Sequence, residues 1–226
     1  MIHSFNDLDE KTALRFELLK AAGYDVANAA KYYAFVAGNE PKDRAAGTTE
    51  PADGVYLMYG KTAVPYIGQE VAETDKAGCT GIGVKFGGKS LVSALDEIGN
   101  NDRPLTTGQG GTRFITDYHK AVEDMDGMAA TNDIRDILNM GIADDEYIPS
   151  LGELYFMLAH FTQINAALEA VGGEPLRDNV YWSSTGYSAT YAWSLYLGRG
   201  GGAYPNTKAT GQVRVRAVSA FLPLNS

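Results

Sequence analysis

Polar and apolar residues follow two different periods along this chain, and the period changes near residue 54. Over residues 5–22, Leu14, Leu18 and Ala22 recur at the four-residue spacing of an amphipathic helix, and residues 26–37 predict a second helix. A polar stretch rich in glycine and proline follows and predicts a linker. Residues 1–46 are therefore expected to form an N-terminal helical hairpin, either packed on the main domain or used for docking or oligomerisation.

From Gly54 onward the apolar positions alternate with a period of two, which is typical of β-strands. One hairpin is predicted within residues 54–68, turning at Gly60. A second is predicted within residues 81–98, turning at two consecutive glycines, which is a common signal for a tight turn between strands. Residues 98–113 show no period and predict a long irregular loop.

Four helices are predicted after this loop, the first two short, over residues 114–124 and 132–140. The third helix begins at Ser150, which can form a capping box with Glu153. The fourth spans residues 163–171 and ends at two glycines. In the third helix, the residues expected to face the core are Leu151, Leu154, Tyr155 and Leu158.

The last part of the chain returns to strand-like alternation. Within residues 192–197 the large apolar side chains alternate with Ser194 and Tyr196, which are expected to face solvent. Residues 213–217 alternate in the same way and predict a final strand. Strands at both ends with helices between them predict an α+β fold.

Charge is unevenly distributed over the 226 residues, whose formal net charge is −9. No acidic residue follows Asp178, whereas four cations do, and the rest of the chain is strongly acidic. An acidic body argues against nonspecific nucleic-acid binding. The late cations either favour an anionic partner or are paired internally in the final strand; they are Arg199, Lys208, Arg214 and Arg216.

The residues between the framework positions of the last segment are mostly tyrosine, serine, glycine, threonine and arginine. Binding loops favour these types because they combine contact area or adaptable hydrogen bonds with a low entropic cost. Such a set on a fixed scaffold indicates recognition rather than catalysis.

Five short motifs in the second half of the chain resemble the framework of C-type lectin-like domains. More narrowly, they resemble the variable proteins of diversity-generating retroelements found in gut bacteria and their phages. The resemblance is good over residues 127–221, weaker back to residue 54, and does not cover residues 1–46. The motifs are Tyr-Ile-Pro-Ser-Leu-Gly-Glu-Leu from Tyr147, the glycine pair at 172–173, Tyr-Trp-Ser-Ser-Thr from Tyr181, Ala-Trp at 192–193, and Val-Arg-Ala-Val from Val215.

In that family a reverse transcriptase mutates adenines, mainly in Asn codons, at the 3′ end of the gene. Such codons can become Gly, Ser, Ala, Thr, Tyr, Arg, Pro or Asn, but not Lys, Gln or Trp. The resemblance implies a variable region at about residues 181–221, with candidate variable positions 186–191, 194, 196, 198–207, 209–211 and, at its margin, 213. Residues that the codon rule excludes fall at framework positions such as Trp182, Trp193, Lys208 and Gln212.

The ligand-binding residues expected from this resemblance share small or aromatic side chains at exchangeable positions. We expect four tyrosines to provide contact area and Arg199 to provide a polar hot spot. The full set is Gly186, Tyr187, Ser188, Thr190, Tyr191, Ser194, Tyr196, Arg199, Gly201, Ala203, Tyr204, Asn206 and Thr207.

Enzymatic and metal chemistry find little support in the sequence. His3, His119 and His160 lack metal-ligand spacing, and the acidic residues 144–146 are expected to form a solvated turn. The motifs of calcium-dependent sugar sites are interrupted at Glu174-Pro175-Leu176 and Trp182-Ser183-Ser184. Cys79 is the only cysteine, so neither a disulfide nor a formylglycine-generating cysteine pair is expected. No catalytic residue, metal or cofactor is therefore predicted.

The leading hypothesis is a non-enzymatic receptor-binding protein that serves phage adsorption or bacterial surface display. It would consist of the helical hairpin over residues 1–46 and a lectin-like domain over residues 47–226. The alternatives are a fixed-sequence adhesin without a retroelement and, less favoured, a formylglycine-generating enzyme. The expected partner is a protein or glycan on a cell surface, and self-association is also expected. Nucleic acid is not an expected partner. No hydrophobic run is long enough to insert in a membrane. No signal peptide is visible, so synthesis in the cytoplasm and later association with a virion or cell surface are expected.

Overall fold

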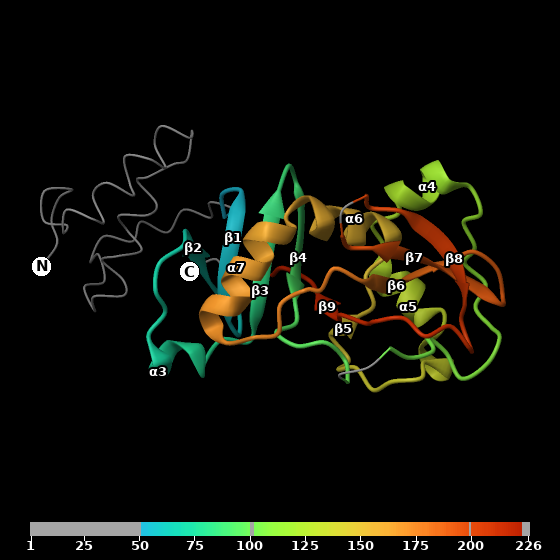
Figure 1. The fold of residues 1–226 in the computed structure, drawn as a ribbon, viewed down its shortest axis with the longest axis horizontal. Helices are drawn as coiled ribbons and strands as arrows, with labels where there is room; N and C mark the ends of the chain where they lie inside the picture. Colours follow the sequence, from blue (N-terminus) through green and yellow to red (C-terminus); the bar gives the residue numbers. More distant parts are fainter. Residues whose placement is uncertain (1–50, 100–101, 199, 223–226) are drawn as a thin grey trace, which may run out of the picture. The chain divides into compact units, whose positions relative to one another are not determined.

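The structure is a computed structural model that describes residues 51–99, 102–198 and 200–222 (Figure 1). The predicted N-terminal hairpin lies outside these residues. All helices and strands given below belong to the unit spanning residues 52–223. They form a mixed α+β fold with antiparallel sheets, as the sequence predicts.

The first sheet has six strands in the order β2-β1-β3-β4-β9-β5. Its two hairpins are those predicted, and they turn at glycines with positive φ, including Gly60 at +61° and Gly87 at +58°. An L side chain rarely adopts this conformation, which explains glycine at the turns. The strands are β1 (Gly54–Tyr59), β2 (Thr62–Tyr66), β3 (Gly81–Phe86), β4 (Lys89–Ser93), β5 (Glu146–Tyr147) and β9 (Val218–Ser219).

Helix α7 (Phe161–Val171) packs against β1 and β3 of this sheet (Figure 1). Its buried face contains Ile164, Leu168 and Val171, which follow helical spacing. The helix ends at Gly172, whose φ of +78° provides a left-handed C-cap. It begins two residues earlier than predicted, directly after helix α6 (Leu151–Ala159). The short helix α3 (Glu73–Lys76) also contacts it.

Both short helices differ from their predicted positions. Helix α4 (Tyr118–Glu123) begins later than predicted, because Asp117 caps it by accepting a hydrogen bond from the Lys120 amide. The helix predicted over 132–140 is wrong: α5 (Gly127–Asn132) precedes it, capped by Asp126, and only a 3-10 turn (Arg135–Ile137) lies inside the range. Capping aspartates determine both starts.

The capping box predicted for α6 is confirmed, since Ser150 and Glu153 exchange side-chain and backbone hydrogen bonds. Its predicted core face needs correction. Leu151 and Leu154 are fully buried, but Phe156 and Met157 are buried in place of Tyr155 and Leu158. The helix lies between structural layers and is covered on more than one side, so a single apolar stripe does not describe it.

The second sheet has three antiparallel strands, β6 (Val180–Gly186), β7 (Tyr191–Tyr196) and β8 (Ala203–Thr207). Its strand register defines two faces. Trp182, Ser194 and Tyr204 lie on one face, whereas Tyr181, Leu195 and Ala203 lie on the other. Helix α6 contacts β6 and β7, and Trp182 packs into a core with Leu105, Val213 and Val215.

The final strand predicted over 213–217 is wrong, because regular pairing begins only at Val218. Regular pairing is limited to β9, and the preceding residues instead form isolated bridges from Val213 to Arg103 and from Arg214 to Tyr181. Val215 and Ala217 accept backbone hydrogen bonds from the 94–98 segment. Residues 213–217 lie between the 94–103 segment and β6. Each of these supplies only isolated backbone hydrogen bonds, so no continuous ladder forms.

Candidate ligand-binding face

The connection between β6 and β7 is a tight turn whose backbone is held by the side chain of Ser188. Its hydroxyl oxygen accepts hydrogen bonds from the amides of Thr190 and Tyr191, at 3.2 and 3.1 Å. The amides of Tyr187 and Ser188 in turn donate to the Tyr191 carbonyl, at 2.9 and 3.0 Å. Ser188, a predicted ligand contact, therefore has a structural role in the turn.

Neighbouring segments also hold this turn, which we call the hairpin tip (residues 187–190). The Gly110 amide donates to the Ala189 carbonyl, and the Lys208 amide donates to the Thr190 carbonyl, both at 2.9 Å. These backbone hydrogen bonds fix the tip from two sides. Substituting a side chain at the tip would leave both of them in place.

The two predicted tyrosines that are most exposed lie on opposite faces of the second sheet. Tyr191 and Tyr204 have exposed fractions of 40% and 44%. Tyr191 pairs with Thr207, whereas Tyr204 pairs with Ser194, three residues further along β7. Because strand side chains alternate, an odd separation places the two rings on opposite sides. The predicted single face is therefore divided in two.

Tyr191 shares its side of the sheet with Trp193, a buried residue that contacts two other aromatic rings. The ring centroid of Trp193 lies 5.4 Å from that of Tyr187 and 6.0 Å from that of Tyr118. Its indole nitrogen donates to the Ile115 carbonyl at 2.7 Å. We call the set Tyr118, Tyr187, Tyr191 and Trp193 the aromatic face.

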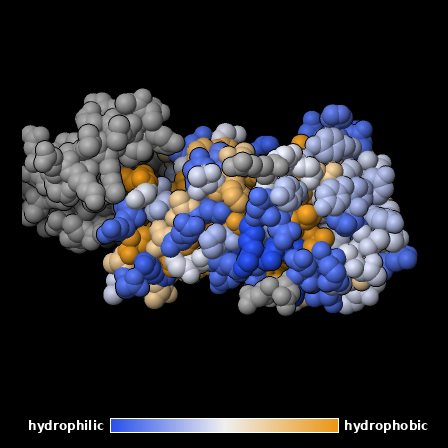
Figure 2. Space-filling view, viewed as in Figure 1, coloured by the Kyte–Doolittle hydropathy of each residue, from blue (hydrophilic) through white to orange (hydrophobic). Residues whose placement is uncertain are grey.

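Phe114 lies outside this face, because its bridge partner Gly186 pairs with Ala192, whose side chain points away from the side of Tyr191 and Trp193. It forms a parallel bridge with Gly186, and the next amide, that of Ile115, donates to the Gly186 carbonyl at 2.8 Å. Phe114 and Tyr118 are each 42% exposed. In the view of Figure 2, residues of intermediate hydropathy gather over the region that β7 and β8 occupy in Figure 1.

The side bearing Tyr204 is more polar. The Ser194 hydroxyl donates to the Tyr204 carbonyl at 2.9 Å and accepts from the Asn206 amide group at 2.8 Å. Tyr196 lies on this side too, and a hydrogen bond to the Asp178 side chain raises the pKa of its phenol. Tyr196 and Asn206 are thus engaged with their own protein.

Two predicted variable positions, besides Val213 at the margin of the region, are buried framework positions. Ser194 was expected to face solvent but is fully buried, because both faces of β7 are covered at its centre. Gly186 is also buried, and a Cβ atom there would lie 2.5 Å from the Arg113 carbonyl oxygen. A side chain at Gly186 would separate the 113–115 segment from the hairpin.

The remaining predicted contacts lie in or beside β8. Ala203 is half-buried, and the Thr207 hydroxyl is hydrogen-bonded to that of Thr210 at 2.7 Å. Gly201 has a φ of +52°, and a Cβ there would lie 2.9 Å from the Leu158 side chain. Arg199 lies outside the described residues. Among these positions, Thr207 is the cross-strand partner of Tyr191.

Lys208, predicted to be framework, connects the hairpin to the segment that carries Phe114. It is 1% exposed, its ammonium donates to the Gly110 carbonyl at 2.8 Å, and it lies 5.4 Å from the Phe114 ring centroid. Burial lowers its pKa, although the nearby Asp133 carboxylate acts in the opposite direction. This lysine is therefore internal and does not present its charge to a ligand.

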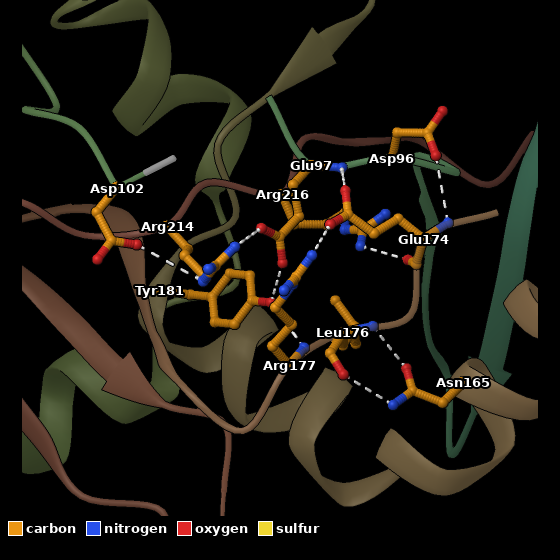
Figure 3. Close-up of polar contacts among 10 residues, drawn as sticks. All are labelled: Asp96, Glu97, Asp102, Asn165, Glu174, Leu176, Arg177, Tyr181, Arg214 and Arg216. Atoms are coloured by element: carbon orange, nitrogen blue, oxygen red, sulfur yellow. Dashed lines mark hydrogen bonds and ion pairs between the residues drawn. The ribbon is translucent and has the colours of Figure 1, made fainter. Parts of the chain in front are cut away.

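Arg214 and Arg216 are internal as well, as one of the two interpretations predicts. Glu97, which is buried, accepts hydrogen bonds from Arg214 at 2.5 Å and from the Tyr181 hydroxyl (Figure 3). Arg216 donates to the carbonyls of Ala94 and Glu174, at 3.1 and 2.6 Å.

This buried cluster joins segments that are distant in sequence. Burial lowers the pKa of the Arg216 guanidinium, whereas burial and the hydrogen bond to Glu97 raise the pKa of Tyr181. The Glu174 carboxylate completes the cluster by pairing with Arg177 at 2.5 Å. The positive charge of the C-terminal segment is thus largely used to hold the second sheet to the 94–97 segment.

The candidate catalytic and metal-binding residues remain dispersed. Cys79 is buried, and burial raises its thiol pKa. The His160 ring stacks on Phe86 with centroids 3.9 Å apart, and His119 lies on α4. Within the described ranges, no three histidine, cysteine or acidic residues are grouped to hold a metal ion. None of the helices described is long and apolar enough to cross a membrane.

Comparison with known proteins adds no family to this geometry. No family model matches the chain, and neither a curated protein nor a solved structure is similar to it.

Sequence reasoning missed Phe114 and Tyr118 as surface residues. Both lie before the segment that the resemblance marks as variable, and Phe114 was assigned to a helix. The run Phe114-Ile115-Thr116-Asp117-Tyr118 contains a signal for the position of Tyr118, because Asp117 is a capping residue and so places Tyr118 at the first turn of α4. The contact of α4 with Trp193 is tertiary and has no local signal.

Proposed function

We propose that this protein is a non-enzymatic receptor-binding protein that displays a diversifiable surface on a C-type lectin-like scaffold. Two antiparallel sheets, with the consecutive helices α6 and α7 packed against them, support the scaffold assignment. Two framework residues from the motifs that carry the resemblance are also buried. Trp182 is fully buried, and Arg216 is held by backbone carbonyls.

The observation that carries the proposal is the separation of exposed rings from the residues that hold the fold. Tyr191 is exposed and directly follows the hairpin tip, whose backbone is fixed by Gly110 and Lys208, and Tyr187, the first residue of the tip, is partly exposed. Substitution of exposed side chains usually changes stability by no more than about 0.5 kcal/mol. Such a surface can change its chemistry while the fold beneath it stays the same, as a diversified binding protein requires.

The role we propose is receptor recognition in phage adsorption or bacterial surface display, with a cell-surface protein or glycan as the ligand. Tyrosine is well suited to this role because a rigid ring gives a large contact area for little conformational entropy. No catalytic step is proposed. Self-association and the N-terminal docking role remain part of the proposal.

Binding of the fluorescently labelled full chain to a panel of gut bacterial cells, measured by flow cytometry, tests the proposal. We expect Tyr191→Ala to reduce binding at least tenfold while the melting temperature stays within a few degrees, since the ring is exposed. Unchanged binding by Tyr191→Ala, or loss of binding only in variants that also unfold, would contradict it. A chain that binds no cell in the panel counts against it too.

A further inference from the structure

The loop between β7 and β8 is rich in glycine, and its glycines differ in what the fold requires of them. Gly200 and Gly201 have φ values of +117° and +52°. L side chains rarely adopt φ values in this range, so both positions need glycine for backbone reasons. Gly198 has no such φ, but a Cβ atom there would collide with the Asp178 carboxylate. The fold therefore favours glycine at all three positions.

Gly201 is also tied to helix α6. The Tyr155 hydroxyl donates to the Gly201 carbonyl at 2.8 Å, and the Gly201 amide donates to the Gly198 carbonyl at 3.2 Å. A Cβ atom at Gly201 would lie 2.9 Å from the Leu158 side chain, which is closer than a relaxed contact between carbon atoms. Gly201, a predicted ligand contact, therefore belongs to the framework that positions the loop.

Gly202 differs from these three glycines. Its φ lies outside the left-handed range, the residue is exposed, and a Cβ atom there would have no atom of the described residues within 4 Å. Glycine loses more conformational freedom on folding than any other residue, so it weakens extended chain relative to alanine. Of the loop glycines that the structure describes, Gly202 alone can be replaced without a steric or backbone cost.

A side chain at position 202 would lie on the same side of the sheet as the exposed ring of Tyr204. The Gly202 carbonyl accepts a hydrogen bond from the Tyr196 amide at 3.0 Å, so the pairing of β7 with β8 continues one residue beyond Ala203. Alternation then places positions 202 and 204 on one side of the strand, with Tyr196 across from position 202. Tyr204 is 44% exposed. Glycine at 202 thus leaves open space next to a ring that a ligand can reach.

We infer that position 202 determines specificity in the receptor-binding surface, and that its glycine leaves room for a group of the receptor that projects beside Tyr204. This inference rests on the proposed function. A binding surface discriminates between partners by steric exclusion as well as by attraction. The diversification rule allows serine, tyrosine or asparagine at this position. Each would fill the space, while the loop stays anchored to α6 through Gly201.

A matched pair of variants tests whether the fold depends on position 202. Gly200→Tyr is the control for Gly202→Tyr, because both glycines are exposed with open surroundings in the described part of the chain, and they differ in φ. We expect thermal unfolding of Gly202→Tyr within about 2 °C of wild type, and a loss of about 4 °C or more in Gly200→Tyr. Equal losses in the two variants would overturn the inference, because position 202 would then belong to the framework.

The cell-binding assay with the full chain tests the specificity role. On cells that bind the wild type, Gly202→Tyr should reduce binding by about fivefold or more, because its ring fills the open space. Gly202→Ala fills little of that space and should change binding by less than about twofold. Tyr204→Ala removes the neighbouring ring and should also reduce binding by about fivefold or more.

The failure of this inference and the failure of the proposed function give different results. Wild-type binding by Gly202→Tyr, with loss of binding in Tyr191→Ala, would overturn the role of position 202 and leave the proposed function intact. Unchanged binding in Gly202→Tyr, Tyr204→Ala and Tyr191→Ala would contradict the proposed function itself.

Discussion

The centre of the second sheet and its tip obey different rules, although they share strands. At the centre, Trp182 and Ser194 are fully buried on the same face, and Leu195 is fully buried on the other. Directly beside the tip, where β7 begins, Tyr191 keeps 40% of its surface exposed. The difference shows that tolerance to substitution depends on distance from the centre of the sheet. Alternation along the strand does not determine this tolerance by itself.

The largest effect is expected at the centre. Trp182→Ala removes a fully buried ring whose indole nitrogen donates to the Arg103 carbonyl at 2.8 Å. Replacing a buried tryptophan by alanine typically costs about 3–5 kcal/mol. Urea denaturation monitored by circular dichroism should show this loss, and a loss below about 1 kcal/mol would contradict the burial described.

A comparable loss is expected where the sheet joins the 94–97 segment. Glu97→Ala leaves Arg214 buried without its closest partner, and breaking a buried pair in this way costs about 3–5 kcal/mol. Arg177, whose side chain is 52% exposed where it pairs with Glu174, is the control, because Arg177→Ala should be far less harmful. Equal losses of unfolding free energy for the two variants would contradict the larger role given to the buried pair of Glu97 and Arg214 (Figure 3).

Ser194→Tyr and Tyr191→Ser compare the two regions directly, because each introduces a residue that the diversification rule allows. Overpacking a filled core costs about 1–3 kcal/mol, so we expect Ser194→Tyr to lose at least that much. Tyr191→Ser should change the unfolding free energy by no more than about 0.5 kcal/mol. Thermal unfolding of the two variants in parallel is the measurement. Equal tolerance would remove the distinction between centre and tip.

Glu153, in the α6 capping box, provides a test that depends on pH. Its pKa is raised, mainly because it is buried, although hydrogen bonds from Ser150 and Tyr147 act in the opposite direction. The folded state therefore holds a proton at pH values where the unfolded chain has lost it, and stability should fall as pH rises through that window. Glu153→Gln can keep the capping box and should lack this dependence.

The measurement is the unfolding free energy of wild type minus that of Glu153→Gln, followed from about pH 4 to about pH 7, since the unfolded carboxyl titrates near the lower limit. The difference should decrease as pH rises. A difference that increases with pH would show that hydrogen bonding to the carboxylate outweighs its desolvation.

The smallest effects on stability are expected for the two exposed tyrosines. Tyr191→Ala and Tyr204→Ala should each change the unfolding free energy by about 0.5 kcal/mol or less. Differential scanning calorimetry can compare them with wild type. A loss of several kcal/mol in either variant would show that the ring holds the fold and is not available for exchange.

Local patterns in the sequence are enough to predict much of this fold. Gly60 and the pair after Phe86 predict the turns of the first sheet, and Ser150 with Glu153 predicts the start of α6. The burial of Ser194 is different, because period-two alternation identifies two faces but not whether the second is covered. Capping by Asp117 and Asp126 sets helix starts that hydrophobic spacing alone misplaces.

The candidate site was predictable only in part, for a similar reason. Tyr187 and Tyr191 stand out by composition and position in the predicted variable region. Tyr118 joins them through a contact with Trp193 that links distant segments. The division between Tyr191 and Tyr204 depends on the strand register, which the sequence does not specify for β8.

Deep sequencing of codons 180–226 in natural populations that carry this gene tests the central claim most directly. The account predicts that substitutions concentrate at the partly exposed position 187 and the exposed positions 191 and 204, and spare Gly186, Trp193 and Ser194. Substitutions at Gly186 and Ser194 as frequent as those at Tyr191 would contradict the distinction between centre and tip. Codons 180–226 that vary no more than codons 54–94 would contradict the diversified surface and identify a fixed adhesin instead.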